Sequence, residues 1–175
     1  MRFSKTPAIA MLALIALITA SCARNNADGA PQLSDHDQIA ALVPRLGTAL
    51  DERNIDQLRV ICTDDITVET PGGRSVGHDA VIAQANRIHT SGQQTQHVLT
   101  DIVVDLQRDR AEVRANSTAT FVLANSSTTP ATPLFRVGEI YRFRAARTDH
   151  GWRLSRVAST PVWGEGTLPP TITRR

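Results

Sequence analysis

Residues 95–123 of the chain read TQHVLTDIVVDLQRDRAEVRANSTATFVL, two long runs in which polar and apolar side chains largely alternate. Alternation at period two is typical of strands, because successive side chains point to opposite faces of a sheet. The charged residues between the runs indicate a tight turn. We therefore expect an antiparallel hairpin, with the rest of the domain organised around it.

The same stretch predicts which residues face one another. If Gln107–Arg108 forms a two-residue loop, Ile102 faces Val113 on the apolar face of the hairpin. On the opposite face, this register sets His97 against Thr118. Gln-Arg is a poor pair for a primed turn, so a longer loop is the alternative. A slip by one residue would turn every side chain to the wrong face, so the alternating pattern specifies the register strongly.

The composition is that of one globular domain. The 175 residues, of which 41% are hydrophobic, are enough to bury a core. The net charge is +2, the basic residues are dispersed, and aromatic residues make up only 4% of the chain. Nucleic-acid binding calls for a clustered basic surface and often for stacking aromatic side chains. We therefore expect no nucleic-acid partner.

Residues 1–22 are typical of a signal peptide. Two basic residues precede an apolar run, residues 8–20, that is too short to span a bilayer comfortably. The run ends in Thr-Ala-Ser-Cys, which resembles a lipobox with Cys22 as the lipidated residue. Lipidation at Cys22 predicts a membrane-anchored lipoprotein of the cell envelope. Cleavage after Ala23 is the alternative, and it would release a secreted, soluble protein.

The rest of the chain divides into a tether, a folded domain and a tail. Residues 23–33 are rich in Asn, Asp, Gly, Pro and Gln, which predicts a flexible tether. The predicted domain covers residues 34–164 and begins at Ser34, an expected helix N-cap. Residues 165–175 are expected to be an unstructured tail.

The order of the expected elements predicts the fold class. Helices come first with two short strands among them, and four long strands joined as a meander follow. This order favours an α+β fold, in which the helices pack on one face of a curved antiparallel sheet. The sheet also offers a surface through which a homo-oligomer could form.

Few side chains have the spacing of a known reactive centre. No pair of histidines or carboxylates has metal-ligand spacing, and no glycine-rich phosphate loop is present, so we expect neither a metal nor a cofactor. His89 continues the apolar stripe of the helix expected to begin near His78, and it is a candidate for lining a cavity. Trp163, in the last expected strand, is predicted either to pack in the core or to close a pocket mouth.

Five short motifs together carry a family resemblance. They are LDERN at 50–54, TDDITV at 63–68, GHDA at 77–80, TQHVLTD at 95–101 and GWRL at 151–154. In this order and spacing, they make residues 34–164 resemble the SnoaL-like branch of the nuclear transport factor 2-like superfamily. The resemblance implies a cone-shaped α+β barrel, in which helices and a curled sheet enclose an apolar cavity for a small organic ligand.

The resemblance also implies a reaction. In lyases of this superfamily, an Asp on the long helix orients a His on a strand, and the His takes a proton from the substrate; the matching positions here are Asp51 and His97. Thr118 and Tyr141 are then candidates for holding a substrate oxygen. Strict alternation places His97 on the face away from the apolar one, so this role requires a β-bulge or a cavity on the polar face.

Two classes of function are compatible with the sequence. The first, slightly favoured, is a non-catalytic domain that binds a small apolar ligand or takes part in assembly at the envelope. The second is a lyase or isomerase, similar to the dehydratases of the superfamily, that uses Asp51 and His97 as an acid–base pair. Direct contact between these two side chains inside a cavity would favour the second class.

Overall fold

The computed structural model describes residues 33–124 and 131–169 of the chain. The predicted signal peptide, the lipidation site Cys22, the tether up to residue 32 and the tail from residue 170 lie outside the described residues. Within the described ranges, no helix is both long enough and apolar enough to cross a bilayer.

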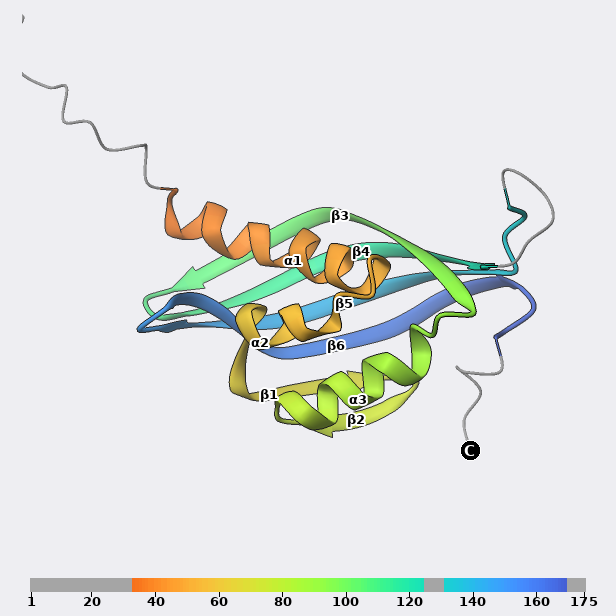
Figure 1. Cartoon of the computed structure of the whole chain (residues 1–175). Helices are drawn as coiled ribbons and strands as arrows, with labels where there is room; N and C mark the ends of the chain where they lie inside the picture. The colour runs from red at the N-terminus through yellow and green to blue at the C-terminus, as the bar shows by residue number, and fades with distance from the viewer. Residues whose placement is uncertain (1–32, 125–130, 170–175) are drawn as a thin grey trace, which may run out of the picture. The chain divides into compact units, whose positions relative to one another are not determined.

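The helices form one layer of the domain (Figure 1). Helix α1 spans Asp35–Asp51, and the hydroxyl of Ser34 caps it by accepting a hydrogen bond from the backbone N–H of Asp37 at 3.1 Å. This cap is the one predicted from the sequence. The other helical elements are the 3₁₀ turn η1 (Ile55–Gln57) and the helices α2 (Leu58–Ile61) and α3 (His78–Ile88).

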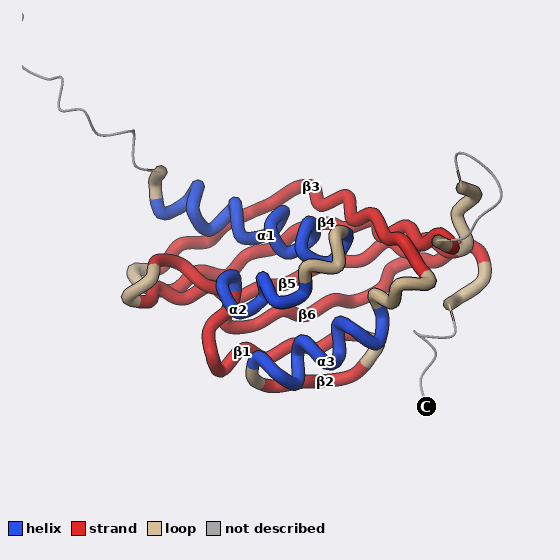
Figure 2. The backbone as a smooth tube through the Cα atoms, in the orientation of Figure 1, coloured by secondary structure: helices blue, strands red, loops and turns tan. Residues whose placement is uncertain are grey.

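The strands form the second layer, a six-stranded sheet within the described residues, with the helices on one of its faces (Figures 1 and 2). The strands are β1 (Cys62–Thr70), β2 (Gly73–Val76), β3 (Gln93–Gln107), β4 (Arg110–Leu123), β5 (Phe135–Thr148) and β6 (Gly151–Gly166). Their order across the sheet is β2-β1-β6-β5-β4-β3. Ile39 and Val43 of α1 are fully buried, as are Phe143 of β5 and Leu154 of β6, so α1 lies against the sheet through its apolar stripe.

The predicted α+β fold class is confirmed, including the meander from β3 to β6. The sheet is mixed, however, because β1 and β6 run parallel whereas all the other neighbouring strands are antiparallel. No tight turn joins β1 to β6, so nothing local imposes an antiparallel arrangement on that pair. The predicted tail is wrong at its start, because β6 continues through Gly166 and Leu168 lines the cavity described below.

The register of the β3–β4 hairpin differs from the predicted one. The loop is Arg108–Asp109, and Val113 pairs with Val104 rather than with Ile102. Arg108 has a positive φ of 52°, a conformation that is uncommon for residues other than glycine, asparagine and aspartate. The residue types in the turn therefore gave no reason to place the loop there.

A β-bulge divides β3 into two halves. The pairing with β4 shifts between Thr100 and Val103, and Asp101 adopts a positive φ of 51°. The side chain of Asn116 donates a hydrogen bond to Asp101 Oδ2 at 2.7 Å, which ties the bulge to β4. One extra residue in a strand exchanges its two faces beyond that point, because side chains alternate with period two.

The bulge decides the direction in which His97 points. On the tip side of the bulge the predicted faces are correct, with Ile102 and Val104 packed against the core. On the other side they are inverted, so Val98 is 51% exposed while the side chain of His97 is only 5% exposed. His97 therefore pairs with Ala119, and the predicted pairing with Thr118 is wrong.

Candidate active site

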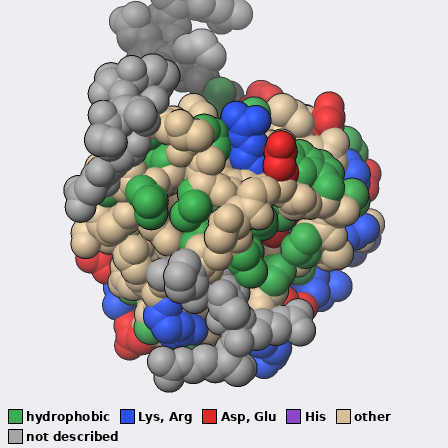
Figure 3. All heavy atoms as spheres, turned by 90° about the vertical axis from the view of Figure 1, so that its right-hand side faces the viewer, with side chains coloured by type: hydrophobic (Ala, Val, Ile, Leu, Met, Phe, Trp, Pro, Cys, Tyr) green, Lys and Arg blue, Asp and Glu red, His purple; other side chains and the backbone are tan. Residues whose placement is uncertain are grey.

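A cavity of about 630 Å³ lies between the helices and the inner face of the sheet. Its wall is mostly apolar and includes Leu46, Leu50, Val81, Ile88, Phe121, Val137 and Val157. Val162 and Trp163 line the cavity but are 64% and 47% exposed, so the cavity opens beside them. Figure 3 looks onto this end of the domain, where hydrophobic side chains gather at the surface. The size and lining suit a small organic molecule.

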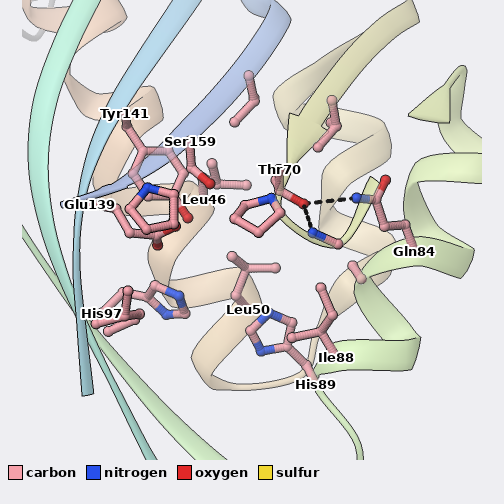
Figure 4. Close-up of a pocket in the computed structure, with 18 of the residues that line it drawn as sticks. Leu46, Leu50, Thr70, Gln84, Ile88, His89, His97, Glu139, Tyr141 and Ser159 are labelled. Atoms are coloured by element: carbon pink, nitrogen blue, oxygen red, sulfur yellow. Dashed lines mark hydrogen bonds between the residues drawn. The ribbon is translucent and has the colours of Figure 1, made fainter. Parts of the chain in front are cut away.

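The polar side chains of the cavity form two groups in the close-up (Figure 4). On one side are His97, His89, Glu139, Tyr141 and Ser159, and on the other side are Thr70 and Gln84. Gln84 Nε2 donates hydrogen bonds to Thr70 Oγ1 at 3.0 Å and to the carbonyl oxygen of Gly73 at 3.1 Å. The second group thus ties α3 to the turn between β1 and β2, which explains its polar residues structurally.

Asp51 and His97 are in direct contact. His97 Nδ1 lies 2.6 Å from Asp51 Oδ1, and the backbone N–H of His97 donates to Asp51 Oδ2 at 2.8 Å. An ionised carboxylate can only accept hydrogen bonds, so Nδ1 carries the proton of the neutral imidazole and Nε2 keeps its lone pair. The ring lies in the cavity wall, where Nε2 is the nitrogen available to a ligand (Figure 4).

The close approach of α1 to β3 makes this contact possible. Gly47 lies one turn before Asp51, and a Cβ atom at Gly47 would come within 2.7 Å of Leu99 Cδ1 on β3. The absence of a side chain at this position therefore lets the last turn of α1 lie close to the strand. The bulge and this close packing together bring Asp51 to His97.

The charge of Asp51 follows from its partners. Burial by itself raises the pKa of the carboxyl, but hydrogen bonds from His97 and Thr95 outweigh burial and lower that pKa below its ordinary value. Thr95 Oγ1 donates to Asp51 Oδ1 at 3.0 Å. Asp51 is therefore ionised at neutral pH, and it can stabilise a proton that His97 takes up.

Thr95 also connects His89 to the same carboxylate. His89 Nδ1 lies 3.3 Å from Thr95 Oγ1, and the rings of His89 and His97 are 5.7 Å apart. A hydroxyl has one proton, so Thr95 can donate to Asp51 only while it accepts from His89. Burial lowers the pKa of His89 to about 4, so His89 is neutral at physiological pH. The structure places His89 in the cavity wall, as the helical spacing predicted.

Glu139 is the site residue that sequence reasoning missed. It lies on β5 between Val137 and Tyr141, lines the cavity, and is the only acidic side chain among the described lining residues. Burial raises the pKa of its carboxyl, while hydrogen bonding to Ser159 and Tyr141 and the charge of His97 partly oppose that change. A signal was present, because period two puts Glu139 on the same face as four aromatic or aliphatic residues of its strand: Phe135, Val137, Tyr141 and Phe143.

The remaining candidates divide between the two faces of the sheet. Tyr141 is buried and lines the cavity. Trp163 also borders the cavity, but its indole lies over Gly138, which pairs with Thr118, and therefore on the outer side of the sheet beside the opening. A Cβ atom at Gly138 would come within 2.1 Å of Trp163 Nε1, so only glycine leaves room for the ring. Thr118 does not line the cavity, because alternate residues of β4 face inward and Thr118 lies on the outer face. Its predicted contact with a ligand has no basis in this geometry.

The cavity wall has no cationic side chain among the described lining residues. Within the described ranges, no cluster of three or more His, Cys, Asp or Glu residues could hold a metal ion. Among the polar lining residues, His97 and Glu139 can transfer protons, and Tyr141, Ser159 and His89 can form hydrogen bonds.

The domain class is shown by sequence comparison. Residues 31–158 match the sequence profile of the SnoaL-like domain, and the chain belongs to that family. No curated protein matches the chain significantly.

Several solved structures have a similar fold. The Kfla4162 protein of Kribbella flavida is 27% identical, with a TM-score of 0.64 over 75% of this chain and 93% of its own. A putative scytalone dehydratase of Novosphingobium aromaticivorans is 18% identical, with a TM-score of 0.66 over 77% of this chain and 89% of its own. A type 2 hexachlorocyclohexane dehydrochlorinase (LinA) is 18% identical, with a TM-score of 0.63 over 78% and 99%. At these identities the last two establish a common fold.

Proposed function

We propose that the protein is a lyase or isomerase that acts on a small, mostly apolar organic molecule, with His97 as the base that removes a proton from carbon. The observation that carries this proposal is the 2.6 Å contact between His97 Nδ1 and Asp51 Oδ1 in a cavity wall. The sequence alone slightly favoured a non-catalytic binding domain. This contact reverses the preference, because a binding cavity for an apolar ligand needs no oriented imidazole.

The contact supports a specific division of roles. A substrate C–H bond directed at His97 Nε2 gives its proton to the nitrogen, and the C–H electron pair passes to the substrate. The ionised Asp51 holds the ring in place and stabilises the imidazolium that forms. An isomerase returns the proton to a different carbon, whereas a lyase lets a leaving group depart with its bonding electrons. The putative dehydratase and the dehydrochlorinase among the similar folds are named for eliminations, reactions in which a leaving group departs.

The proposal is tested by hydrogen exchange in a set of ketones. The methyl protons of acetophenone and the ring α-protons of cyclohexanone exchange with deuterium from D₂O when a base removes them, and NMR measures the rate. We expect the wild type to accelerate exchange and His97→Gln to lose roughly 10²–10⁴-fold of that acceleration. His150→Gln, at an exposed turn, is the matched control. Wild-type rates equal to those of His97→Gln for every ketone would leave a binding protein as the better account.

We also propose that Cys22 holds the domain at the cell envelope. The apolar run and the Thr-Ala-Ser-Cys sequence support this location. Several acyl chains on Cys22 would anchor the protein stably, whereas a single acyl chain binds a membrane only marginally. The intact mass of the mature protein tests the proposal: we expect a chain that begins at Cys22 and carries acyl mass. A chain that begins at Arg24 without acyl mass would contradict it.

A further inference from the structure

We propose that Glu139 is the acid of this site, a neutral carboxylic acid that donates a hydrogen bond, and in an elimination a proton, to an oxygen atom of an uncharged substrate. The proposal rests on the proposed function, in which His97 is the base. It adds a second reacting group and restricts the class of substrate.

The sheet places Glu139 close to His97. Across the sheet, His97 on β3 pairs with Ala119 on β4, and Ala119 pairs with Val137 on β5. Glu139 is the next residue of β5 that points to the same face. The close-up shows its carboxyl and the His97 ring directed into the same part of the cavity (Figure 4). A ligand there would lie against both groups.

The surroundings of Glu139 favour its neutral form. The charged and titratable groups that face it are Tyr141 on its own strand, His97 on β3, His89 after α3 and Asp51 at the end of α1. Among these, only His97 can bring a positive charge near it at neutral pH, and His97 is already paired with Asp51. Burial is the largest influence and raises the pKa of Glu139. A bound ligand would exclude water and raise that pKa further.

The hydroxyls around Glu139 leave its proton available. Tyr141 and Ser159 both form hydrogen bonds with Glu139. The pKa of Tyr141 is raised, chiefly by burial, so its hydroxyl keeps its proton and can donate it to the carboxyl. Glu139 therefore accepts from its protein neighbours and keeps its own O–H for the ligand.

The two groups complete an elimination with balanced protons and electrons. His97 Nε2 takes a proton from a substrate carbon, and the C–H electron pair becomes the new C=C π bond. The neighbouring C–O bond breaks with its electron pair, and Glu139 gives its proton to the leaving oxygen, so that water departs. The imidazolium of His97 then returns its proton, through water, to the Glu139 carboxylate. The net reaction is the conversion of an alcohol into an alkene and water.

The cavity also selects the charge of the substrate. Its described lining residues include no Arg and no Lys, so no such side chain there could neutralise a carboxylate or phosphate. An anion would be buried there without a partner, which is costly. We therefore assign to the site an uncharged, mostly apolar substrate that carries a hydroxyl or carbonyl oxygen and an acidic C–H bond on the adjacent carbon.

Binding of three probes of similar shape tests the role of Glu139 without requiring the natural substrate. Acetophenone carries an uncharged acceptor oxygen, benzenesulfonate is an anion throughout the pH range used, and ethylbenzene has no polar group. Calorimetric affinities are measured just above pH 4.5, where an ordinary Glu is becoming ionised. The variants are Glu139→Gln, which keeps a donor, Glu139→Leu, which has none, and the exposed control Glu112→Gln on the neighbouring strand β4.

A neutral Glu139 gives a distinctive pattern of affinities. We expect Glu139→Gln and Glu112→Gln to bind acetophenone within about twofold of the wild type, and Glu139→Leu to bind it about tenfold more weakly. Ethylbenzene should bind equally to all variants, and benzenesulfonate should bind the wild type at least about tenfold more weakly than acetophenone. The affinity of the wild type for acetophenone should fall as the pH rises through the raised pKa of Glu139, and this fall should be absent in Glu139→Gln.

Other patterns overturn the proposal. Tighter acetophenone binding by Glu139→Gln than by the wild type at this low pH would show that Glu139 is already ionised. Equal binding by Glu139→Leu would show that Glu139 does not contact the oxygen, and tight benzenesulfonate binding would refute the charge selection. Failure of the proposed function is a separate result, because His97→Gln would then leave ketone exchange unchanged whatever the affinities show.

Discussion

Two carboxyl groups near His97 have pKa values that their surroundings displace in opposite directions. Asp51 ends α1 and is held by three hydrogen bonds from Thr95 and from the ring and backbone of His97, which lower its pKa. Glu139 projects from the apolar face of β5 into the cavity, and burial raises its pKa. The first group is suited to support a base, and the second is suited to act as an acid.

The difference shows that the residue type alone does not assign a chemical role. Both groups are carboxyls, and both are partly screened from water. Hydrogen-bond donors around Asp51 stabilise its charged form, whereas the apolar surroundings of Glu139 favour its neutral form. A pair of groups whose pKa values are displaced in opposite directions is the arrangement that acid–base catalysis needs.

The largest effect is expected from neutralising the charged member of the pair. Asp51→Asn keeps the shape of the side chain but removes the charge that stabilises a protonated His97. We expect ketone exchange to slow by roughly 10²-fold or more. The exposed neighbour Glu52 supplies the matched control, Glu52→Gln, which should exchange at the wild-type rate. If the two variants were equally active, the Asp51 charge would have no part in the reaction.

The bulge at Asp101 turns His97 to the face of the sheet where it contacts Asp51 and shares the cavity with Glu139. Removing the bulge should therefore separate His97 from both carboxyl groups. Asp101→Val puts a β-branched residue at a positive φ and deletes the hydrogen bond from Asn116. We expect a loss of about 2–3 kcal/mol in stability, which is the sum of the backbone strain and the lost hydrogen bond. Chemical denaturation measures it, with Asp105→Val on the tip side of β3 as the control. Asp101→Gly should retain the bulge, and an equal loss in Asp105→Val would argue against strain at Asp101.

Opposite pH dependences of stability should distinguish the two carboxyls. The pKa of Glu139 is raised in the folded state, so its contribution is fully present below pH 4.5 and is lost as the pH rises through the folded pKa. Glu139→Gln should therefore gain stability relative to the wild type over that window, by about 1.4 kcal/mol for each unit of pKa difference.

Asp51 should behave in the reverse way. Its pKa is lowered in the folded state, so its contribution is present above pH 3.8 and is lost as the pH falls through the folded pKa. Denaturation curves of the wild type, Asp51→Asn and Glu139→Gln across this range supply the measurement. Slopes of the same sign for the two variants would mean that the carboxyls have similar surroundings.

A smaller effect is expected at Thr95, which stabilises the charge of Asp51 and has no such role at Glu139. Thr95→Val keeps the volume of the side chain and removes the hydrogen bonds to Asp51 and His89. We expect a loss of about 1 kcal/mol in stability and up to about tenfold in ketone exchange. Thr95→Ser should restore both quantities. A Thr95→Ser variant as impaired as Thr95→Val would indicate that the methyl group matters and the hydroxyl does not.

The smallest effect is expected at Thr118, on the outer face of β4. Thr118→Ala should change stability by less than about 0.5 kcal/mol and leave acetophenone affinity at the wild-type value, because the side chain does not reach the cavity. Calorimetric affinities for acetophenone in Thr118→Ala and in Glu139→Leu compare the outer face of the sheet with the face that borders the cavity. A substantial loss of affinity in Thr118→Ala would restore the register that the sequence predicted.

Much of the fold could be predicted because it depends on local patterns. The Ser34 cap, the apolar stripe of α1 and the alternation in the four long strands are properties of short segments. The family motifs placed Asp51 and His97 among the candidates. Glu139 could also have been found, since period two places it on the apolar face of its strand, where a charged residue calls for an explanation.

The sequence by itself determined the secondary structure, the layer order and the identity of the two residues now found in contact. Only the tertiary structure decided which way His97 points, because that depends on one extra residue in β3 at Asp101, where nothing in the residue types marks a bulge. It also decided the directions in which the pKa values of Asp51 and Glu139 are displaced. A carboxyl is ionised or neutral according to the donors and apolar groups that surround it, and these come from strands and helices distant in the chain.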